Sequence, residues 1–559
     1  MKCSKNLMFC KNIFTRYPNN LKNTFYITTP IFYVNASPHI GHLYSAVIAD
    51  AAHRFYYLLD HKRGILSTGT DEHGIKIQQS AAKHNTSLLE YCTAISQQYQ
   101  SLFEQCDIDF TDFLRTTEDR HKKSVHYFWE CLKAADLIYP GIYSGWYCVQ
   151  EESFLGNTQL KDGLGKDGKL CKVSAESGHP VEWTTENNFM FRLSSLQNDL
   201  LYWLKDERVV QPLKFHHQLV SWVQDETLVQ DVSVSRPKDR VHWGIPVPDD
   251  SNQIIYVWLE ALVNYLTVAG YPDPSYQHLW PPDLQIIGKD ILRFHGIYWP
   301  AFLIGAGLEP PRMIFCHSHW TVNGEKMSKS KGNVVRVSDA LDQFTASGLR
   351  YFLLREGVAH NDGNYSETKA VHILNAELAD TFGNLLNRCC GAALNPLHVF
   401  PKFCQHDFDQ YCSDDARRLV DTVSALPDAV KSHFGALNFY KGIDVIIATL
   451  HEANRFFESQ KPWELKKSPE LRTKLDFVLH LTMETLRVCG IALQPIVPEL
   501  CNILLQKLEV PPNQRFWSDI RPFSWEQTSQ LKDIPISSEK VTLFKKLLKP
   551  KNESPRNRS

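Results

Sequence analysis

The sequence predicts an α/β protein built on a doubly wound parallel sheet, with an inserted segment and an all-α C-terminal region. A strand–helix–strand pattern occupies the first hundred residues, and a second one begins near residue 283. Helical periodicity dominates from about Asp339 onward. Because roughly residues 115–255 separate the two patterns, we expect that segment to be inserted between two parts of one sheet.

The first pattern begins with "NTFYITTPIFYVN", whose run from Phe25 to Thr28 predicts a strand that ends in a turn. Apolar residues of "SPHIGHLYSAVIADAAHRFYYLLD" recur at intervals of three and four, which predicts a helix. Ser37 is the expected N-cap of this helix and Pro38 its first residue. "GILSTGTDEHG" then predicts a short strand that ends in a polar turn.

The second pattern predicts a strand in "DLQIIGKD", an amphipathic helix in "DILRFHGIYWPAFLIGAG" and a last strand in "RMIFCHSHW". Within the inserted segment, "KDGLGKDGKL" is the expected exposed turn. Stretches such as "AELADTFGNLLNRCCGAAL" and "LRTKLDFVLHLTMETLRVCGIAL" predict the helices of the C-terminal region. The tail "LLKPKNESPRNRS" is polar and is expected to fray.

The length of 559 residues predicts two to four domains. The composition is that of a globular protein, since 43% of the residues are hydrophobic and 22% are charged. The net charge of −2 gives no basic field over the whole protein, although this value is compatible with a local basic groove. Nothing resembles 18 consecutive apolar residues, so no membrane span is predicted. The 14 cysteines include no C-x-x-C, which favours reduced, buried thiols over disulfides or a zinc knuckle.

Residues 1–22 are basic and hydroxylated, and the first acidic residue of the chain is Asp50. This composition is typical of a mitochondrial transit peptide. The alternative is a disordered basic start of a cytosolic protein.

Two short motifs carry the chemistry. "HIGH" comprises His39, Ile40, Gly41 and His42 at the start of the first predicted helix, where free N–H groups and the helix dipole favour a phosphate. "KMSKS" begins about 285 residues later and is expected just after the last strand, at the sheet edge where doubly wound folds bind nucleotides. Taken alone, either motif could be a surface feature, but their joint occurrence in these settings is specific.

The pair resembles the signatures of class I aminoacyl-tRNA synthetases. "YVNASPHIGH", "GTDEHG", "YVWLEA", "IIGKDILRFHGIYWPA" and "VNGEKMSKSKGN" look like methionyl-tRNA synthetases, the organellar members in particular, over roughly residues 24 to 545. The resemblance implies a Rossmann-type catalytic domain in two halves, 23–114 and 255–338, around a connective insertion at 115–254. It implies a linking stem-contact region at 339–374, a helical anticodon-binding domain at 375–545 and a polar tail at 546–559.

The resemblance implies a two-step reaction, in which methionine and ATP form methionyl-adenylate and pyrophosphate before transfer to tRNA. His39 and His42 would contact the α-phosphate region and ribose, and Lys329, supported by Lys326, would pair with the leaving phosphates. ATP is expected with Mg²⁺ held mainly by the phosphates. The implied ATP site comprises His39, Ile40, Gly41, His42, Lys326, Met327, Ser328, Lys329 and Ser330.

Methionine needs an apolar, polarisable slot and an acid for its ammonium group. The resemblance assigns that acid to Asp71. The other residues it implies for the slot are Ile31, Tyr33, Trp258, Ala261, Leu262, Tyr265, Ile291 and His295. Leu262 departs from the family pattern, where proline is frequent, and should reshape the pocket edge modestly. Plain core packing is the alternative for each aromatic side chain.

The insertion is expected to contain no structural zinc, because Cys148 and Cys171 are single cysteines where other members carry paired ones. A partial site with His179 is the alternative. The length of the insertion, about 140 residues, also argues against a large editing domain.

Asn384, Arg388 and Trp463 match family positions that read the CAU anticodon of tRNA(Met). An amide, a guanidinium and an exposed aromatic ring suit single-stranded bases. The alternative for Trp463 is that it staples one helix to the next.

Three other functions stay open at this point. They are a class I synthetase for leucine, isoleucine or valine, a catalytically silent tRNA-binding paralogue, and a nucleotidyltransferase that acts on a small metabolite. The sequence shows no clear dimerisation surface, so a monomer with no membrane partner is expected, and the N-terminal composition together with the resemblance implies the mitochondrial matrix.

Overall fold

The computed structural model describes residues 24–149, 153–156, 160–164, 170–175, 178–322, 324–327, 335–521 and 532–548. The predicted transit peptide at residues 1–22 lies outside the described residues. The chain forms two compact units. We call Met1–Pro38, Gly64–Glu104 and Asp109–His317 the sheet unit, and His39–Arg63, Gln105–Ile108 and Ser318–Ser559 the helical unit.

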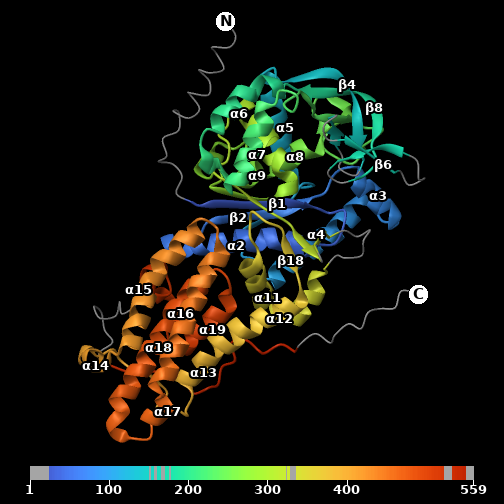
Figure 1. Cartoon of the computed structure of the whole chain (residues 1–559). Coiled ribbons are helices and arrows are strands. Elements are labelled where there is room, and N and C mark those ends of the chain that lie inside the picture. Colours follow the sequence, from blue (N-terminus) through green and yellow to red (C-terminus); the bar gives the residue numbers. More distant parts are fainter. Residues whose placement is uncertain are drawn as a thin grey trace, which may run out of the picture. The chain divides into compact units, whose positions relative to one another are not determined.

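A six-stranded parallel sheet forms the centre of the sheet unit, in the order β3-β2-β1-β14-β15-β9. The strands are β1 (Tyr26–Tyr33), β2 (Ile65–Asp71), β3 (Asp112–Arg115), β9 (Val210–Gln211), β14 (Leu284–Gly288) and β15 (Ile314–His317). Strand β1 lies beside β2 (Figure 1), and β14 pairs with its other edge. The strand order therefore reverses at β1, and the predicted doubly wound sheet is confirmed.

The predicted insertion supplies the edge strand β9 and three smaller antiparallel assemblies. These are β10-β8-β4-β5, β11-β13-β12 and the hairpin β6-β7. Their bounds are β4 (Ile138–Cys148), β5 (Ser153–Leu155), β6 (Leu160–Leu164), β7 (Leu170–Ser174), β8 (Glu182–Phe191), β10 (Val232–Ser233), β11 (Ser235–Pro237), β12 (Pro246–Val247) and β13 (Asp250–Ile255). The turn predicted in "KDGLGKDGKL" is wrong for residues 161–164, which form part of β6, and for Leu170, which begins β7, while residues 165–169 lie outside the described residues.

Helices and large aromatic side chains complete the sheet unit. The helices that do not carry candidate site residues are α3 (Ile75–Lys83), α4 (Leu88–Gln105), α5 (Asp119–Ala134), α6 (Gln197–Trp203) and α7 (Leu213–Gln224). Phe128, Trp129, Phe191 and Trp299 are each at most 1% exposed. Aromatic side chains of this size contribute most of the apolar area that a core removes from water.

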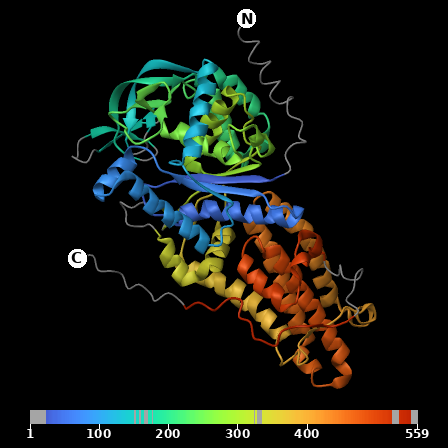
Figure 2. The same ribbon diagram turned by 180° about the vertical axis from the view of Figure 1, so that it is seen from behind.

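The helical unit contains α2 (Ile40–Asp60) and the helices of the C-terminal region, as predicted from periodicity. Those helices are α11 (Val337–Glu356), α12 (Glu367–Ile373), the π-helix η8 (Leu374–Gly383), α13 (Asn384–Cys390), α14 (Gln405–Tyr411), α15 (Asp414–Gly435), α16 (Phe439–Gln460), α17 (Pro462–Leu465), α18 (Arg472–Leu493) and α19 (Pro498–Lys507). Helices α15, α16 and α18 pack side by side (Figures 1 and 2). Every residue from Phe477 to Leu493 is buried, so α18 is the central helix of this bundle.

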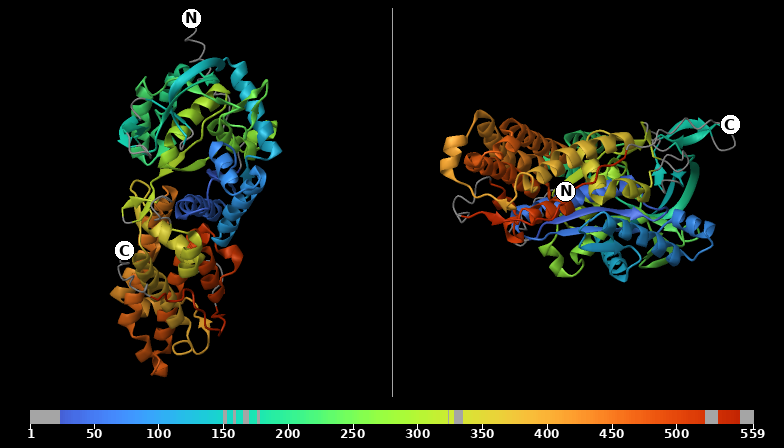
Figure 3. Two further views of the ribbon diagram at one scale, coloured as in Figure 1. Left: turned by 90° about the vertical axis from the view of Figure 1, so that its right-hand side faces the viewer. Right: turned by 90° about the horizontal axis from the view of Figure 1, so that it is seen from below.

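The C-terminal segment is bound along the helical unit as far as residue 548, in red in Figures 2 and 3. Strand β20 (Ile534–Pro535) pairs with β19 (Val399–Phe400). Further along, the Leu547 N–H donates to Asn375 Oδ1 (2.7 Å), and Lys546 pairs with Asp380 (2.8 Å). The fraying predicted for this tail is therefore wrong for its first residue, Leu547, because these bonds hold it.

Acid is expected to weaken the helical unit through His480, which is 2% exposed on α18. Its Nδ1 bonds the Pro401 carbonyl oxygen (2.7 Å), and burial lowers its pKa from 6.5 to about 4. The stability that the neutral ring contributes is complete above pH 6.5 and is lost as pH falls toward 4, by roughly 2–3 kcal/mol. In His480→Asn, whose amide can keep the bond, the melting temperature should fall less between pH 7 and 4.5. An equal fall in both proteins would contradict this assignment.

Candidate functional site

Tyr33 and Asp71 lie next to each other at the carboxyl edge of the parallel sheet. Tyr33 ends β1, Asp71 ends β2, and the two residues are register partners. The Val34 N–H donates to the Asp71 carbonyl oxygen (3.1 Å), which extends the pairing one residue further. Ile31 precedes them on β1. These residues thus lie at the edge where doubly wound sheets bind their ligands.

Trp258, Ala261 and Leu262 lie on α8 (Val257–Leu262), and Tyr265 lies on the next helix, α9 (Asn264–Ala269). Ala261, Leu262 and Tyr265 are at most 6% exposed, so they belong to the hydrophobic core. Trp258 is half-buried and stacks on Phe294, with ring centroids 3.6 Å apart and an interplanar angle of 10°.

Ile291 and His295 do not lie on one regular helix, so that part of the prediction is wrong. The segment passes from a 3-10 turn, η5 (Lys289–Ile291), to a π-helix, η6 (Phe294–Tyr298), and then to α10 (Trp299–Gly305). Pro300 follows the π-helix and has no N–H to donate to a carbonyl one turn earlier, so a regular α-helical ladder is interrupted there. The two residues are still close, because His295 Nδ1 contacts the Ile291 carbonyl oxygen (3.1 Å).

Tyr265 and His295 form a buried hydrogen-bonded pair, with 2.8 Å between the phenol oxygen and Nε2. A carbonyl oxygen only accepts, so Nδ1 carries the proton, Nε2 accepts, and the Tyr265 hydroxyl donates. Burial lowers the pKa of His295 to about 4 and raises that of Tyr265. Both groups are therefore neutral at physiological pH, as a slot for an uncharged thioether requires.

The buried pair His73–Glu260 was not predicted from the sequence. His73 Nδ1 lies 2.8 Å from Glu260 Oε1, and their side chains are 4% and 0% exposed. His73 lies in the turn that follows the last residue of β2, Asp71, and Glu260 lies on α8, the helix that carries Trp258. The pair therefore joins this turn to α8. His73 belongs to the motif "GTDEHG" and Glu260 to the motif "YVWLEA", but neither motif predicts that the two side chains are in contact. His73 and Glu260 also line a pocket together with Trp243.

His39 is the N-cap of α2, so the prediction of Ser37 as N-cap and Pro38 as first helical residue is wrong. The Gly41 N–H donates to His39 Nδ1 (3.1 Å), and the His39 N–H donates to His42 Nδ1 (3.2 Å). The two imidazoles thus satisfy the helix start themselves, and their rings stack 3.8 Å apart. This arrangement fixes both rings at the N-terminus of a long helix.

The sequence predicts the "KMSKS" motif directly after the last strand of the parallel sheet, and this prediction is wrong. Strand β16 (Trp320–Val322) intervenes, and the motif itself begins in β17 (Glu325–Lys326); both belong to a separate small sheet, β17-β16-β18, with β18 (Gly363–Tyr365). The backbone of Lys326 pairs with Thr321, and Met327 follows. Ser328, Lys329 and Ser330 lie outside the described residues.

The chain beyond "KMSKS" returns to the start of α2. His39 and Arg336 form an isolated antiparallel β-bridge. Arg336 is also the N-cap residue of α11, so the start of α11 is paired with the first histidine of "HIGH". The bridge thereby brings Arg336, which follows the motif in the sequence, next to the first histidine of "HIGH" in the helical unit.

Arg388 and Trp463, two of the three predicted anticodon readers, lie together. The Arg388 guanidinium is 5.9 Å from the centroid of the Trp463 ring and 4.8 Å from that of Phe457. It also pairs with Glu458 (2.6 Å). Trp463 is 38% exposed at the start of α17, and Asn384 is exposed at the start of α13. An exposed ring beside a guanidinium is able to stack an unpaired base.

Neither metal nor membrane features occur in the described part of the chain. Cys148 lies on β4 and Cys171 on β7, and no three His, Cys, Asp or Glu side chains among the described residues are placed to hold a metal ion. No helix in the described ranges has the length and apolar character needed to cross a membrane.

Known proteins match this chain over most of its length. The family model "tRNA synthetases class I (M)" matches residues 25–390. The mitochondrial methionine–tRNA ligase of Takifugu rubripes is 47% identical over 98% of this chain and 94% of its own length. The human mitochondrial ligase is 47% identical over 88% of this chain and 84% of its own. The crystal structure of Mycobacterium tuberculosis methionyl-tRNA synthetase bound by methionyl-adenylate gives a TM-score of 0.86 at 34% identity and covers 94% of this chain and 100% of that one. On these grounds, the chain belongs to the methionyl-tRNA synthetases of class I.

Proposed function

We propose that this chain attaches methionine to its cognate tRNA for mitochondrial protein synthesis. The observation that carries the proposal is the 47% identity with a mitochondrial methionine–tRNA ligase over nearly the whole chain. In the first step the methionine carboxylate attacks the α-phosphorus of ATP and releases pyrophosphate. In the second step a hydroxyl of the tRNA 3′-terminal adenosine attacks the adenylate and releases AMP.

The amino acid is recognised by residues of the sheet unit. The Asp71 carboxylate pairs with the methionine ammonium group. The neutral Tyr265–His295 pair and the Trp258 ring, which stacks on Phe294, provide the polarisable slot for the thioether. Ile31, Tyr33, Ala261, Leu262 and Ile291 complete its apolar lining.

The phosphates are handled by the two motifs, and neither step needs a covalent enzyme nucleophile. His39 and His42 are fixed at the N-terminus of α2, where backbone N–H groups and the helix dipole favour negative charge. The β-bridge from His39 to Arg336 supports a role for the "KMSKS" segment at the same phosphates. Lys329 would neutralise the leaving pyrophosphate, with Lys326 in support. ATP is expected to bring its own Mg²⁺.

The tRNA anticodon is read by residues of the helical unit. Asn384, Arg388 and Trp463 would bind the CAU anticodon of tRNA(Met) by stacking and by hydrogen bonds to base edges. The domain boundaries given by the resemblance, the mitochondrial matrix as the compartment and a monomeric state are parts of the same proposal.

Exchange of labelled pyrophosphate into ATP tests the proposed function. The purified chain lacking residues 1–22 is expected to catalyse exchange with methionine, and not with leucine, isoleucine or valine. A neutral apolar slot rejects a smaller or branched side chain by about 1–3 kcal/mol per methylene, and the orientation of the thioether adds to this. Exchange that depends on leucine, or no exchange with any amino acid, would refute the proposal.

A further inference from the structure

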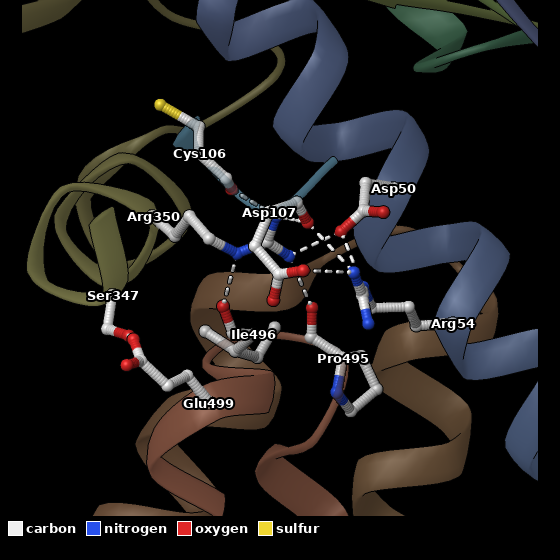
Figure 4. Close-up of polar contacts among 9 residues, drawn as sticks. All are labelled: Asp50, Arg54, Cys106, Asp107, Ser347, Arg350, Pro495, Ile496 and Glu499. Carbon is white, nitrogen blue, oxygen red and sulfur yellow. Dashed lines mark hydrogen bonds and ion pairs between the residues drawn. The ribbon is translucent and has the colours of Figure 1, made fainter. Parts of the chain in front are cut away.

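Arg350, on α11, is a buried cation with every donor occupied. Its side chain is 1% exposed, and a guanidinium has five N–H groups. It donates to Asp50 Oδ2 (2.5 Å) and to the carbonyl oxygens of Cys106 (3.2 Å), Asp107 (3.0 Å), Pro495 (3.1 Å) and Ile496 (3.1 Å), as Figure 4 shows. A guanidinium held at five points can move only if all the segments around it move together.

The acceptors of Arg350 belong to three segments that are far apart in the sequence. Asp50 lies on α2, the helix that begins with "HIGH", and its side chain is 0% exposed. Cys106 and Asp107 follow α4, and Pro495 and Ile496 connect α18 to α19. The bond to Asp50 spans 300 residues and the bond to Ile496 spans 146. Arg350 therefore fixes α2 to the helical bundle.

A second arginine joins α11 to the helices that lead to the anticodon readers. Arg355 pairs with Glu377 on η8 (3.0 Å) and with Asp444 on α16 (2.8 Å). The Tyr351 hydroxyl donates to the same Glu377 carboxylate (2.6 Å). Helix η8 runs directly into α13, which begins at Asn384. Helix α11 is thus bonded to α2 through Arg350 and to the base-reading helices through Arg355.

We propose that Arg350 is a positioning residue for tRNA charging. It holds the helix with His39 and His42 at its first turn in a fixed spacing from the helices with Asn384, Arg388 and Trp463. One tRNA can engage both places productively only when that spacing is kept, since a bound adenosine misplaced by about 1 Å reacts far more slowly. Adenylate formation involves no tRNA and does not depend on the spacing. The inference rests on the proposed function and adds a residue to it.

Arg350→Gln in the full-length chain tests the proposal in two assays. We expect methionine-dependent pyrophosphate exchange within threefold of the wild-type rate. The kcat for charging tRNA(Met) should fall at least tenfold, with the KM for tRNA changed less than threefold, because the anticodon contacts are untouched. Trp463→Ala is the comparison variant, and it should instead raise the KM for tRNA. Loss of correct folding would lower both activities in parallel and leave their ratio unchanged.

Two further variants sharpen the test. Arg350→Lys keeps the charge beside Asp50 but has only three donors for five acceptors, so it should recover part of the charging rate. Arg54→Gln removes the other guanidinium bonded to Asp50 Oδ2 (2.8 Å) without cutting any bond to α11, and should change neither activity more than threefold. In protein whose circular dichroism matches that of the wild type, equal losses of exchange and charging, an effect confined to the KM for tRNA, or unchanged charging would each overturn the proposal. A wild-type chain with no methionine-dependent exchange would instead refute the proposed function.

Discussion

Replacing Asp71 by asparagine is expected to raise the KM for methionine in pyrophosphate exchange by roughly 10²-fold, with the KM for ATP nearly unchanged. The change keeps the size of the side chain and removes its charge, so a bound ammonium group is left desolvated without a counter-ion. Loss of one partner of such a buried charge pair costs about 2–5 kcal/mol, and each 1.4 kcal/mol is a factor of ten. The backbone of Asp71 stays in register with Tyr33 in either case.

The matched control for Asp71 is Asp112, an acid at the start of the neighbouring strand β3. It pairs with Arg120 (2.7 Å), whose side chain is 45% exposed. Exposed pairs of this kind contribute about 0–1 kcal/mol, so Asp112→Asn should leave the KM for methionine within threefold of the wild-type value.

A methionine analogue without the amino group separates binding of the ammonium from general disruption of the site. It should inhibit the wild-type chain far more weakly than methionine binds it. In Asp71→Asn the two ligands should bind almost equally, because the interaction that distinguishes them is gone. A variant that still prefers methionine by the wild-type factor would show that another group holds the ammonium.

The sequence predicts features that depend on local periodicity, and it misses those that depend on distant partners. Strands β1 and β2 follow from short apolar runs, although β1 continues to Tyr33, past the predicted end at Thr28, and doubly wound topology then places their ends at one sheet edge. His73 and Glu260 are 187 residues apart, and Asp50 and Arg350 are 300 apart. No spacing rule links residues at such distances, although a charged residue within an apolar helical face signals that some buried partner exists.

Local errors have local causes. Ser37 is the better N-cap by residue preference, yet α2 starts at Ile40, because the imidazoles of His39 and His42 bond the first N–H groups. The regular helix predicted around His295 is interrupted near Pro300. In both places the departure from the expected pattern involves or adjoins a proposed site residue. Regular local preferences and the requirements of a site differ most where side chains must face a ligand.

Replacing Lys329 by alanine is expected to reduce the maximum rate of methionine-dependent exchange by about 10²- to 10³-fold. Charge develops on the departing pyrophosphate in the transition state, and removal of one group that stabilises such charge costs about 2.7–4 kcal/mol. The methionine slot belongs to different residues, Asp71 and the Tyr265–His295 pair among them. Equilibrium dialysis with labelled methionine should therefore give a dissociation constant within threefold of the wild-type value.

Lys331 provides the control for Lys329, since it is a lysine two positions along the same segment but outside "KMSKS". Lys331→Ala removes the same charge from the neighbourhood, and exchange should fall less than tenfold if the contact made by Lys329 is specific. Lys329→Arg keeps the charge but changes the reach and shape of the donor group, so its rate should lie between those of the wild type and of Lys329→Ala. Equal losses in Lys329→Ala and Lys331→Ala would mean that the segment acts through its general field, because a field depends on total charge while a contact depends on position.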